Sequence, residues 1–335
     1  MKRKTAFKAL TAITLLHLSG AAFAQHDVQG TSALPVGACI NMGNHLEPPR
    51  EGEWGRAIAD DDFAIIARAG FQTVRIPVRW SAHLDKEGGI DPKFMERVAH
   101  VVGLARKAGL NVILNDHNFE ALMRDPAGER ERLAGIWRQV ARRFAAEPRA
   151  HLWFEIANEP HDKLTNANLV ETLRPALAAI RESNPDRPVI VGGENWSGIG
   201  SLATLELPDD PHIVPTVHYY DPFEFTHQGA EWVNPAPPMG RTYGSAADAA
   251  QLARDVETMR AYIARTGKTP FIGEFGAIDK IPAAQRVLYM QTVRAGWAGL
   301  GVGTCAWAYT NTFPLYDSKR GQWLPGMRAA MGLTE

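Results

Sequence analysis

Eight short apolar runs alternate with longer amphipathic patterns along this chain of 335 residues, and no other feature constrains the fold as strongly. The runs are predicted strands: Val36 to Asn41, Thr73 to Val78, Asn111 to Asn115, His151 to Ala157, Val189 to Gly192, Ile213 to His218, Pro270 to Gly273 and Thr304 to Ala308. Strands that alternate with helices pair in a parallel sheet. Eight such units predict an α/β fold, a (β/α)8 TIM barrel in a single domain.

The segments between the runs carry signals for helix starts and stops. Asp91 and Pro92 predict a cap and a first turn, and the helix they open should stop before Gly109. Ser245 should cap the clearest helix, in which apolar residues recur at helical spacing until Gly267. Helices with one apolar stripe are what the outer ring of a barrel requires.

The first 24 residues read as a targeting segment. Lys2 to Lys4 form a positive start, Ala9 to Leu18 is apolar, and Ala24 ends a small-x-small cleavage site. The apolar run is shorter than the roughly 20 residues that span a membrane. We therefore predict a signal peptide at 1–24, cleaved after Ala24, and a secreted or periplasmic catalytic domain at 25–335.

The formal net charge is −1, with both signs interspersed. This balance predicts no nucleic acid and no membrane as partner of the mature chain. No linker, repeat or low-complexity tract divides the sequence, and we expect a monomer. The longest irregular stretch, Asp221 to Tyr243, is rich in Pro, Trp and Phe, and a loop of that length is usually functional.

The two cysteines, Cys39 and Cys305, leave two alternatives open. In an exported protein they can form a disulfide. Each also lies in a predicted strand, where a small buried thiol packs well. Sequence alone does not supply the geometry that decides between them.

In a barrel, the residues that end the strands converge on one face. Those positions hold acids, amides, histidines and aromatic residues, whereas glycine-rich phosphate loops are absent from the sequence. They are Asn41, Asn44, Glu47, Arg75, Trp80, Asp116, His117, Asn118, Asn158, Glu159, Glu194, Trp196, His218, Tyr220, Glu274 and Trp307. Such a mixture suits a neutral polyol such as a sugar chain.

Glu159 and Glu274, at the ends of the fourth and seventh strands, can together cleave an acetal. One would donate a proton to the leaving oxygen while the other attacks or stabilises the oxocarbenium-like centre. A separation of roughly 5 Å would make the second a nucleophile. Glu155, at an even offset from Glu159, is interpreted as a structural carboxylate with an arginine or backbone donors as partners. Glu194 is ambiguous and stays outside this pair.

Five stretches together carry a resemblance to a known family. They are INMGNHLEPPREGEWG from Ile40, VRIPVRW from Val74, FEIANEPH from Phe154, VHYYDPFEFTHQGAEW from Val217 and FIGEFGA from Phe271. In this order they resemble glycoside hydrolase family 5, the cellulase family, and especially its bacterial endo-β-1,4-glucanases that also accept mannan.

The resemblance implies a (β/α)8 barrel that hydrolyses β-1,4-glucan, as polysaccharide or oligosaccharide, with retention and without a cofactor. Glu159 would be the acid/base and Glu274 the nucleophile. A β-mannanase or xyloglucanase on the same scaffold is an alternative. A catalytically inactive carbohydrate-binding barrel is a non-enzyme alternative, against which the presence of both carboxylates argues.

The resemblance also implies roles for supporting residues. Asn158 would hold the sugar's 2-hydroxyl, and Arg75 and Tyr220 would hydrogen-bond Glu274 and keep it ionised. His117 and His218 would line the cleavage subsite, and Trp307 would be its stacking floor. Four further residues match positions that contact sugars: Asn44, Glu47, His227 and Trp232. Asn118 departs from the pattern, since relatives usually carry a second histidine there. This leaves the negative-side subsites and the choice between glucan and mannan open.

Two further expectations concern histidines and tryptophans. His117, His161, His218 and His227 could be read as a metal cluster, but no pair has a chelating spacing, so we predict no metal. Trp232 and Trp307 are expected to be exposed stacking surfaces because of their loop and strand-end positions. Trp54 and Trp80 remain open between core packing and exposure.

Overall fold

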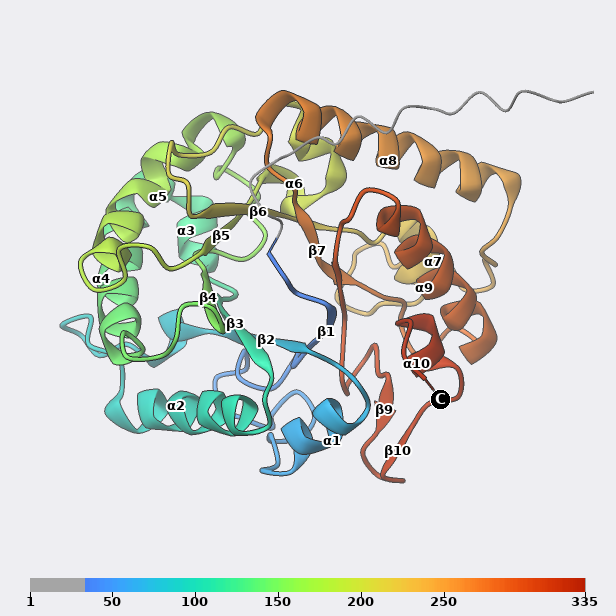
Figure 1. Ribbon diagram of the computed structural model, residues 1–335, viewed down its shortest axis with the longest axis horizontal. Coiled ribbons are helices and arrows are strands. Elements are labelled where there is room, and N and C mark those ends of the chain that lie inside the picture. Colours follow the sequence, from blue (N-terminus) through green and yellow to red (C-terminus); the bar gives the residue numbers. More distant parts are fainter. Residues whose placement is uncertain (1–33, 335) are drawn as a thin grey trace, which may run out of the picture.

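Eight parallel strands close into a barrel in the computed structural model, which describes residues 34–334 (Figure 1). They are β1 (Ala38–Asn41), β2 (Thr73–Val78), β3 (Asn111–Asp116), β4 (Leu152–Glu155), β5 (Val189–Gly192), β6 (Ile213–His218), β7 (Phe271–Phe275) and β8 (Thr304–Ala306). Each strand pairs with the next, and β8 pairs with β1. The predicted barrel is confirmed, and each predicted strand is present with ends that differ by at most a few residues.

Helices surround the barrel and connect its strands (Figure 1). They are α1 (Asp62–Arg68), α2 (Pro92–Lys107), α3 (Glu120–Arg124), α4 (Pro126–Arg143), α5 (Asn166–Arg181), α6 (Glu194–Ser197), α7 (Phe223–Thr226), α8 (Ala246–Thr266), α9 (Ala283–Ala298) and α10 (Met327–Ala330), with short 3-10 turns at Trp80–His83 and Ile199–Ala203. A small hairpin, β9 (Tyr316–Asp317) and β10 (Gln322–Trp323), follows β8.

The helix ends follow the sequence signals. The Asp91 side chain accepts hydrogen bonds from the backbone of Lys93 and Phe94 at the start of α2. Ser245 and Asp248 form a reciprocal capping box at the start of α8. That helix ends at Gly267, which adopts a left-handed φ of 68° that a glycine accepts without strain.

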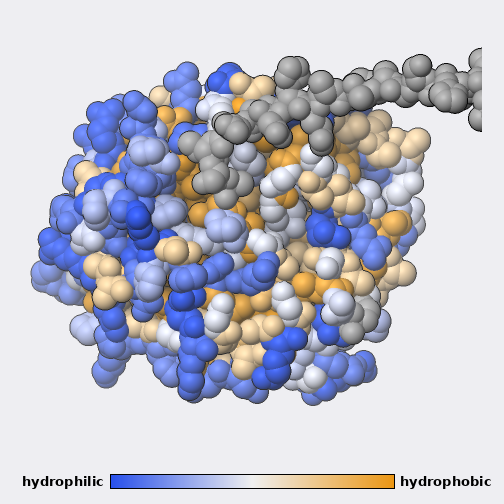
Figure 2. Space-filling model, in the orientation of Figure 1, coloured by the Kyte–Doolittle hydropathy of each residue, from blue (hydrophilic) through white to orange (hydrophobic). Residues whose placement is uncertain are grey.

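The apolar core has two parts. The larger lies between the strands and the helices, and the smaller consists chiefly of strand residues inside the barrel: Val36, Cys39, Ile113, Trp153, Ile190, Phe271 and Cys305, joined by Leu34. In the view of Figure 2, hydrophilic side chains form much of the outer rim over α2, α4 and α5, and hydrophobic ones show between them. The apolar filling of the barrel leaves the strand ends above it for polar groups.

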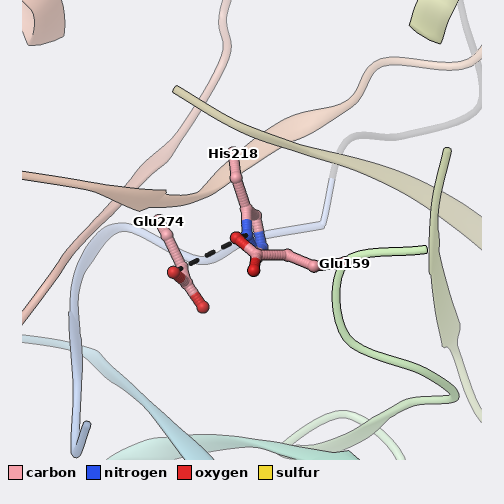
Figure 3. A group of neighbouring side chains, drawn as sticks. All are labelled: Glu159, His218 and Glu274. Atoms are coloured by element: carbon pink, nitrogen blue, oxygen red, sulfur yellow. Dashed lines mark hydrogen bonds and ion pairs between the residues drawn. The ribbon is translucent and has the colours of Figure 1, made fainter. Parts of the chain in front are cut away.

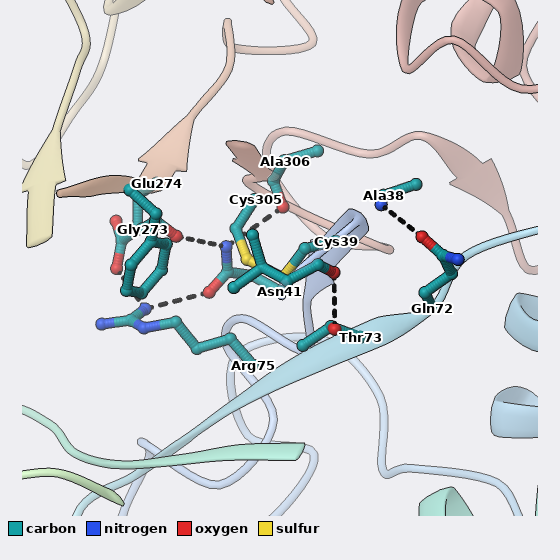
Figure 4. Close-up of a disulfide and its surroundings, with 12 residues drawn as sticks. Ala38, Cys39, Asn41, Gln72, Thr73, Arg75, Gly273, Glu274, Cys305 and Ala306 are labelled. Atoms are coloured by element: carbon teal, nitrogen blue, oxygen red, sulfur yellow. Dashed lines mark hydrogen bonds and ion pairs between the residues drawn. A yellow bond between two sulfur atoms is a disulfide. The ribbon is translucent and has the colours of Figure 1, made fainter. Parts of the chain in front are cut away.

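Cys39 and Cys305 form a disulfide, which decides the alternative that the sequence left open. The two residues are register partners on β1 and β8, the strands whose pairing closes the barrel (Figure 4). Asn41, two residues further along β1, donates hydrogen bonds to the carbonyl oxygens of Gly273 (3.0 Å) and Ala306 (3.2 Å). The disulfide and Asn41 therefore join β1 to β7 and β8 directly below the strand ends.

The predicted loop from Asp221 to Tyr243 contains the one-turn helix α7. Gln228 holds its two halves together, because its side chain accepts from the backbone of Gly240 and Arg241 and donates to the carbonyl of Phe225. The predicted signal peptide lies outside the described residues. Among residues 34–334, no helix is both long and apolar enough to cross a membrane.

Candidate active site

Arg75 lies at the centre of the strand ends and is fully buried. Its Nε and Nη2 donate to both oxygens of Glu155 (2.6 and 2.9 Å), and Nη2 also donates to Oδ1 of Asn158 (2.6 Å). Its Nη1 donates to Oδ1 of Asn41 (2.9 Å) and to Oε1 of Glu274 (2.6 Å). All five N–H groups of the guanidinium are thus used. Glu155 has the arginine partner that the sequence interpretation gave it.

Glu159, from the segment after β4, points toward His218 on β6 and Glu274 on β7 (Figure 3). One ligand atom of each lies within 4.8 Å of the other two. His218 Nδ1 is hydrogen-bonded to Glu159 Oε1 at 2.8 Å and lies 3.6 Å from Glu274 Oε2. The two glutamates that the sequence paired are therefore neighbours.

The two carboxylates have different surroundings. Glu274 is buried and accepts hydrogen bonds from Arg75 and from the Tyr220 hydroxyl (2.9 Å), the two contacts that the resemblance implied. Glu159 keeps 23% of its side chain exposed, and its side-chain partner is His218. The Glu274 carboxylate is thus held on both oxygens, whereas Glu159 faces the opening of the barrel.

Burial raises the pKa of Glu159 to about 7, and the positive charge of Arg75 offsets part of this effect. Burial also raises the pKa of Glu274, while His218 and Arg75 act in the opposite direction. Burial lowers the pKa of His218, so the neutral imidazole is favoured there. Two carboxylates this close cannot both ionise freely, and a shared proton is favoured on the one with fewer donors, Glu159.

The backbone at the end of β4 aims Glu159 into the site. Glu159 has a left-handed φ of 48°, which side chains of this kind rarely adopt. Two hydrogen bonds hold the segment: the Asn158 N–H donates to the Asp116 carbonyl (2.8 Å), and His161 Nδ1 is bonded to the Glu159 carbonyl (2.7 Å). Strained backbone of this sort concentrates at functional sites.

Glu47 shapes the loop that follows β1. Its oxygens accept from the backbone N–H groups of Asn44 (2.6 Å), His45 (2.8 Å) and Leu46 (3.0 Å). Glu47 is buried, and burial raises its pKa to about 7. The structure thus gives Glu47 an evident role in fixing the conformation of Asn44, and sugar contacts by either residue remain a prediction.

Trp307 is 9% exposed, so the expectation of an exposed stacking surface was wrong at this position. Its ring lies against Gly43, where even a Cβ would come within 2.7 Å, and stacks on His117 with centroids 5.8 Å apart. His117 is bonded through Nδ1 to Oδ1 of Asn115 (2.7 Å), and burial lowers its pKa well below the ordinary value. Trp307 therefore presents only an edge or part of a face.

Trp232 is 60% exposed, as expected for a stacking surface. It lies beside His227, which also contacts Tyr220 and stacks on Phe223 with centroids 4.2 Å apart. Burial lowers the pKa of His227 to about 4, so this histidine is neutral near neutral pH. The predicted functional loop thus forms an aromatic wall on the same side as Tyr220.

Of the two tryptophans left open, Trp80 is core and Trp54 is 44% exposed.

Asn118 and Trp196 border a cavity of about 280 Å³ that also includes Asn158, Glu159 and His161. The sequence placed Trp196 at a strand end but gave it no role. Its position in the short segment after β5, between Asn195 and Ser197, was the available signal. Glu194 accepts from the Asn166 N–H (2.9 Å) and so links α5 and α6.

A metal site has to be considered, because Glu159, His218 and Glu274 could supply three ligands. Among residues 34–334 the four histidines considered from sequence do not form such a group. The Arg75 guanidinium already forms an ion pair with the Glu274 carboxylate, and a metal cation beside it would be repelled. The donor set therefore fits a proton-transferring pair better than a metal.

The closed barrel, with two carboxylates and aromatic side chains at the carboxyl ends of its strands, defines the general class of barrel enzymes that work on carbohydrates. The family model of cellulase, glycosyl hydrolase family 5, matches residues 35–312. The chain belongs to glycosyl hydrolase family 5, a family of glycoside hydrolases.

Individual relatives agree with this assignment. Endoglucanase H of Acetivibrio thermocellus is 32% identical over 274 residues, which cover 81% of this chain but 29% of that protein. A hyperthermophilic endo-β-1,4-glucanase in complex with substrate is 40% identical with a TM-score of 0.86, covering 89% of this chain and 97% of the other. Cel5A of Thermotoga maritima, in complex with mannotriose, is 38% identical with a TM-score of 0.85, covering 88% and 97%.

Proposed function

We propose that this protein is a retaining, endo-acting glycoside hydrolase that cleaves β-1,4-glucan by double displacement. The observation that carries the proposal is the pair of neighbouring carboxylates, Glu159 and Glu274, in unlike surroundings. Retaining enzymes hold their carboxyl groups about 5 Å apart, and atoms within 4.8 Å of one another fit that separation. Inverting enzymes hold their carboxyl groups about 6.5–9.5 Å apart to accommodate a water between them, and atoms within 4.8 Å of one another are closer than that mechanism requires.

In the first step, an oxygen of Glu274 attacks the anomeric carbon and the bond from that carbon to the glycosidic oxygen breaks. Glu159 gives its proton to the departing oxygen, so the leaving sugar departs as a neutral alcohol. Arg75 and Tyr220 hold the attacking carboxylate in one orientation. Asn158 is fixed by Arg75 through its Oδ1, and its amide nitrogen can donate to a sugar hydroxyl.

In the second step, the ionised Glu159 takes a proton from water, and the water oxygen attacks the anomeric carbon. The bond to Glu274 breaks, and the carboxylate is restored. Two inversions give net retention. His218, bonded to Glu159, keeps that carboxyl facing the anomeric centre in both steps. Neither step requires a metal or an organic cofactor.

The substrate proposal rests on the relatives and on the aromatic wall that the loop from Asp221 to Tyr243 forms. The solved relatives include an endo-β-1,4-glucanase with substrate and a Cel5A with mannotriose, so a β-mannanase or xyloglucanase activity is a second candidate. Asn118 favours neither glucan nor mannan from its contacts, because its Oδ1 has no hydrogen-bond partner among the described residues. We also propose export through the leader at 1–24 and a monomeric enzyme.

The experiment measures reducing sugar released from carboxymethylcellulose, barley β-glucan, xyloglucan and glucomannan. We expect turnover on at least one β-1,4-glucan, and binding without turnover on all four would instead support the inactive barrel. Glu274→Ala should be nearly inactive, and azide should restore turnover with a product of inverted configuration. Glu224→Ala, which removes an exposed carboxylate from α7, is the matched control and should retain activity.

A further inference from the structure

Strand β7 carries one residue more than its neighbours directly before Glu274. Ile272 of β7 pairs with Val217 of β6. The next residue of β6, His218, already pairs with Glu274, so Gly273 is the extra residue of a β-bulge. The register of β7 with β8 shifts over the same stretch.

The bulge decides which way Glu274 points. In a regular strand alternate residues face the same side, so Glu274 would share the face of Ile272, which packs in the outer core. One extra residue reverses the alternation, so that Glu274 points into the barrel and Phe275 joins the outer core. Gly273 suits the extra position because it has no side chain, and a Cβ there would come within 2.9 Å of His218 Nε2.

The side chain of Asn41, on β1, bridges this bulge and Arg75 (Figure 4). Its Nδ2 donates to the carbonyls of Gly273 (3.0 Å) and Ala306 (3.2 Å). Its Oδ1 accepts from Nη1 of Arg75 (2.9 Å), the same nitrogen that donates to Oε1 of Glu274 (2.6 Å). Asn41 is fully buried, so its side chain is out of reach of a substrate. One carboxamide thereby joins the backbone before Glu274 to the guanidinium that holds its carboxylate.

We propose that Asn41 is a positioning residue for the nucleophile, because it fixes both the backbone and the carboxylate of Glu274 for attack on the anomeric carbon. The inference rests on the proposed function, in which Glu274 is that nucleophile. An amide suits the position, since it supplies two N–H donors for two carbonyls and an acceptor for Arg75. Without it the bulge and the guanidinium lose their common anchor, and a shift of about 1 Å at a reacting atom can cost on the order of 100-fold in rate.

The test isolates the step in which Glu274 attacks. With 2,4-dinitrophenyl 2-deoxy-2-fluoro-β-cellobioside, a Glu274 oxygen bonds to the anomeric carbon, and the bond to dinitrophenolate breaks without a proton from Glu159. The fluorine slows hydrolysis of this adduct, so its amount can be followed by mass. At saturating inactivator, Asn41→Ala should form the adduct at least about tenfold more slowly than the wild type. The half-saturating concentration should stay within about twofold, because Asn41 does not contact the substrate.

Asn184→Ala is the matched control. Asn184 is also buried, donates through Nδ2 to the Ala141 carbonyl (2.9 Å) and accepts through Oδ1 from Nε of Arg187 (2.7 Å). These partners lie on α4 and in the segment before β5, so the rate of adduct formation should not change. Asn41→Asp keeps the size of the side chain and the acceptor for Arg75 but loses the amide donors. It should also slow adduct formation, and it tests the proposal even if Asn41→Ala does not fold.

The outcomes separate positioning from a weakened fold. Variants of Asn41 that form less adduct in total but with the wild-type rate constant would overturn the role of Asn41, because a smaller folded fraction would explain them. Wild-type behaviour of the variants, or an equal decrease in Asn184→Ala, would overturn it as well. A wild-type enzyme that forms no adduct would instead overturn the proposed double displacement, and with it this role.

Discussion

The alkaline limb of the pH profile should belong to Glu159. Its carboxyl must be protonated to act as the acid, and burial raises its pKa to about 7. Glu274 must be ionised, and its bonds to Arg75 and Tyr220 favour the carboxylate. Activity should therefore decrease as the pH rises through the pKa of Glu159 and, at the other end, as the pH falls through that of Glu274.

The magnitude follows from the fraction of protonated Glu159. With a pKa of about 7, roughly half of the enzyme carries this proton at pH 7, about a tenth at pH 8 and about a hundredth at pH 9. The value of kcat/KM for cellotetraose should fall by the same factors. For 2,4-dinitrophenyl β-cellobioside, whose leaving group departs without a proton, kcat/KM should change little between pH 7 and pH 9.

The assay measures kcat/KM for both substrates between pH 4 and pH 10, in the wild type and in Glu159→Ala. The variant should lose most activity on cellotetraose. On the dinitrophenyl substrate it should keep the first step, in which dinitrophenolate departs without a proton. Its profile on that substrate should show no limb near pH 7. The reasoning fails if the variant retains an alkaline limb near pH 7, because another group would then carry the proton.

Three further predictions follow from buried groups. Asp116 is buried without a side-chain hydrogen bond among the described residues, and burial raises its pKa well above the ordinary value. The stability of the fold should therefore be greatest at acid pH, where this carboxyl is protonated in both states, and should decline as the pH rises toward the folded-state pKa. In urea unfolding, Asp116→Leu should be about 1–3 kcal/mol more stable than the wild type at pH 8, with a smaller gain at pH 4. Cys39→Ala with Cys305→Ala should lower the free energy of unfolding by about 2–5 kcal/mol, and reductant should then have no further effect. Excess chelator should leave wild-type activity unchanged, whereas loss of activity that zinc restores would make the carboxylate pair and His218 a metal site.

Apolar patterning predicted the strands because each buried strand is a short, nearly continuous apolar run, as in β5 and β6. Strand-end logic also brought Glu159 and Glu274 together, because the carboxyl ends of all barrel strands meet on one face. The solvent exposure of the tryptophans was harder to predict. Trp307 directly follows β8 and is covered by Gly43 and His117, whereas Trp232 projects from the loop between β6 and β7.

Contacts between distant segments explain what the sequence could not supply. The Cys39–Cys305 disulfide depends on the register of β1 with β8, which no local pattern encodes. The position of Trp196 depends on the left-handed backbone of Asn195, Trp196 and Ser197 and on a hydrogen bond to the Pro160 carbonyl. Asparagine tolerates that conformation, but tryptophan and serine do not signal it. Such features arise from tertiary contacts that override local preference.

The charge balance around Arg75 explains why the two catalytic candidates can differ. One guanidinium faces two carboxylates, Glu155 and Glu274, so the buried group already carries one excess negative charge. Ionising Glu159 would add a second, and no N–H of Arg75 remains for it. Glu155 therefore does more than fill the barrel: it takes two of the arginine's donors. Replacing Glu155 with glutamine should make Glu159 easier to ionise and move the alkaline limb to lower pH, a shift that loss of packing alone would not produce.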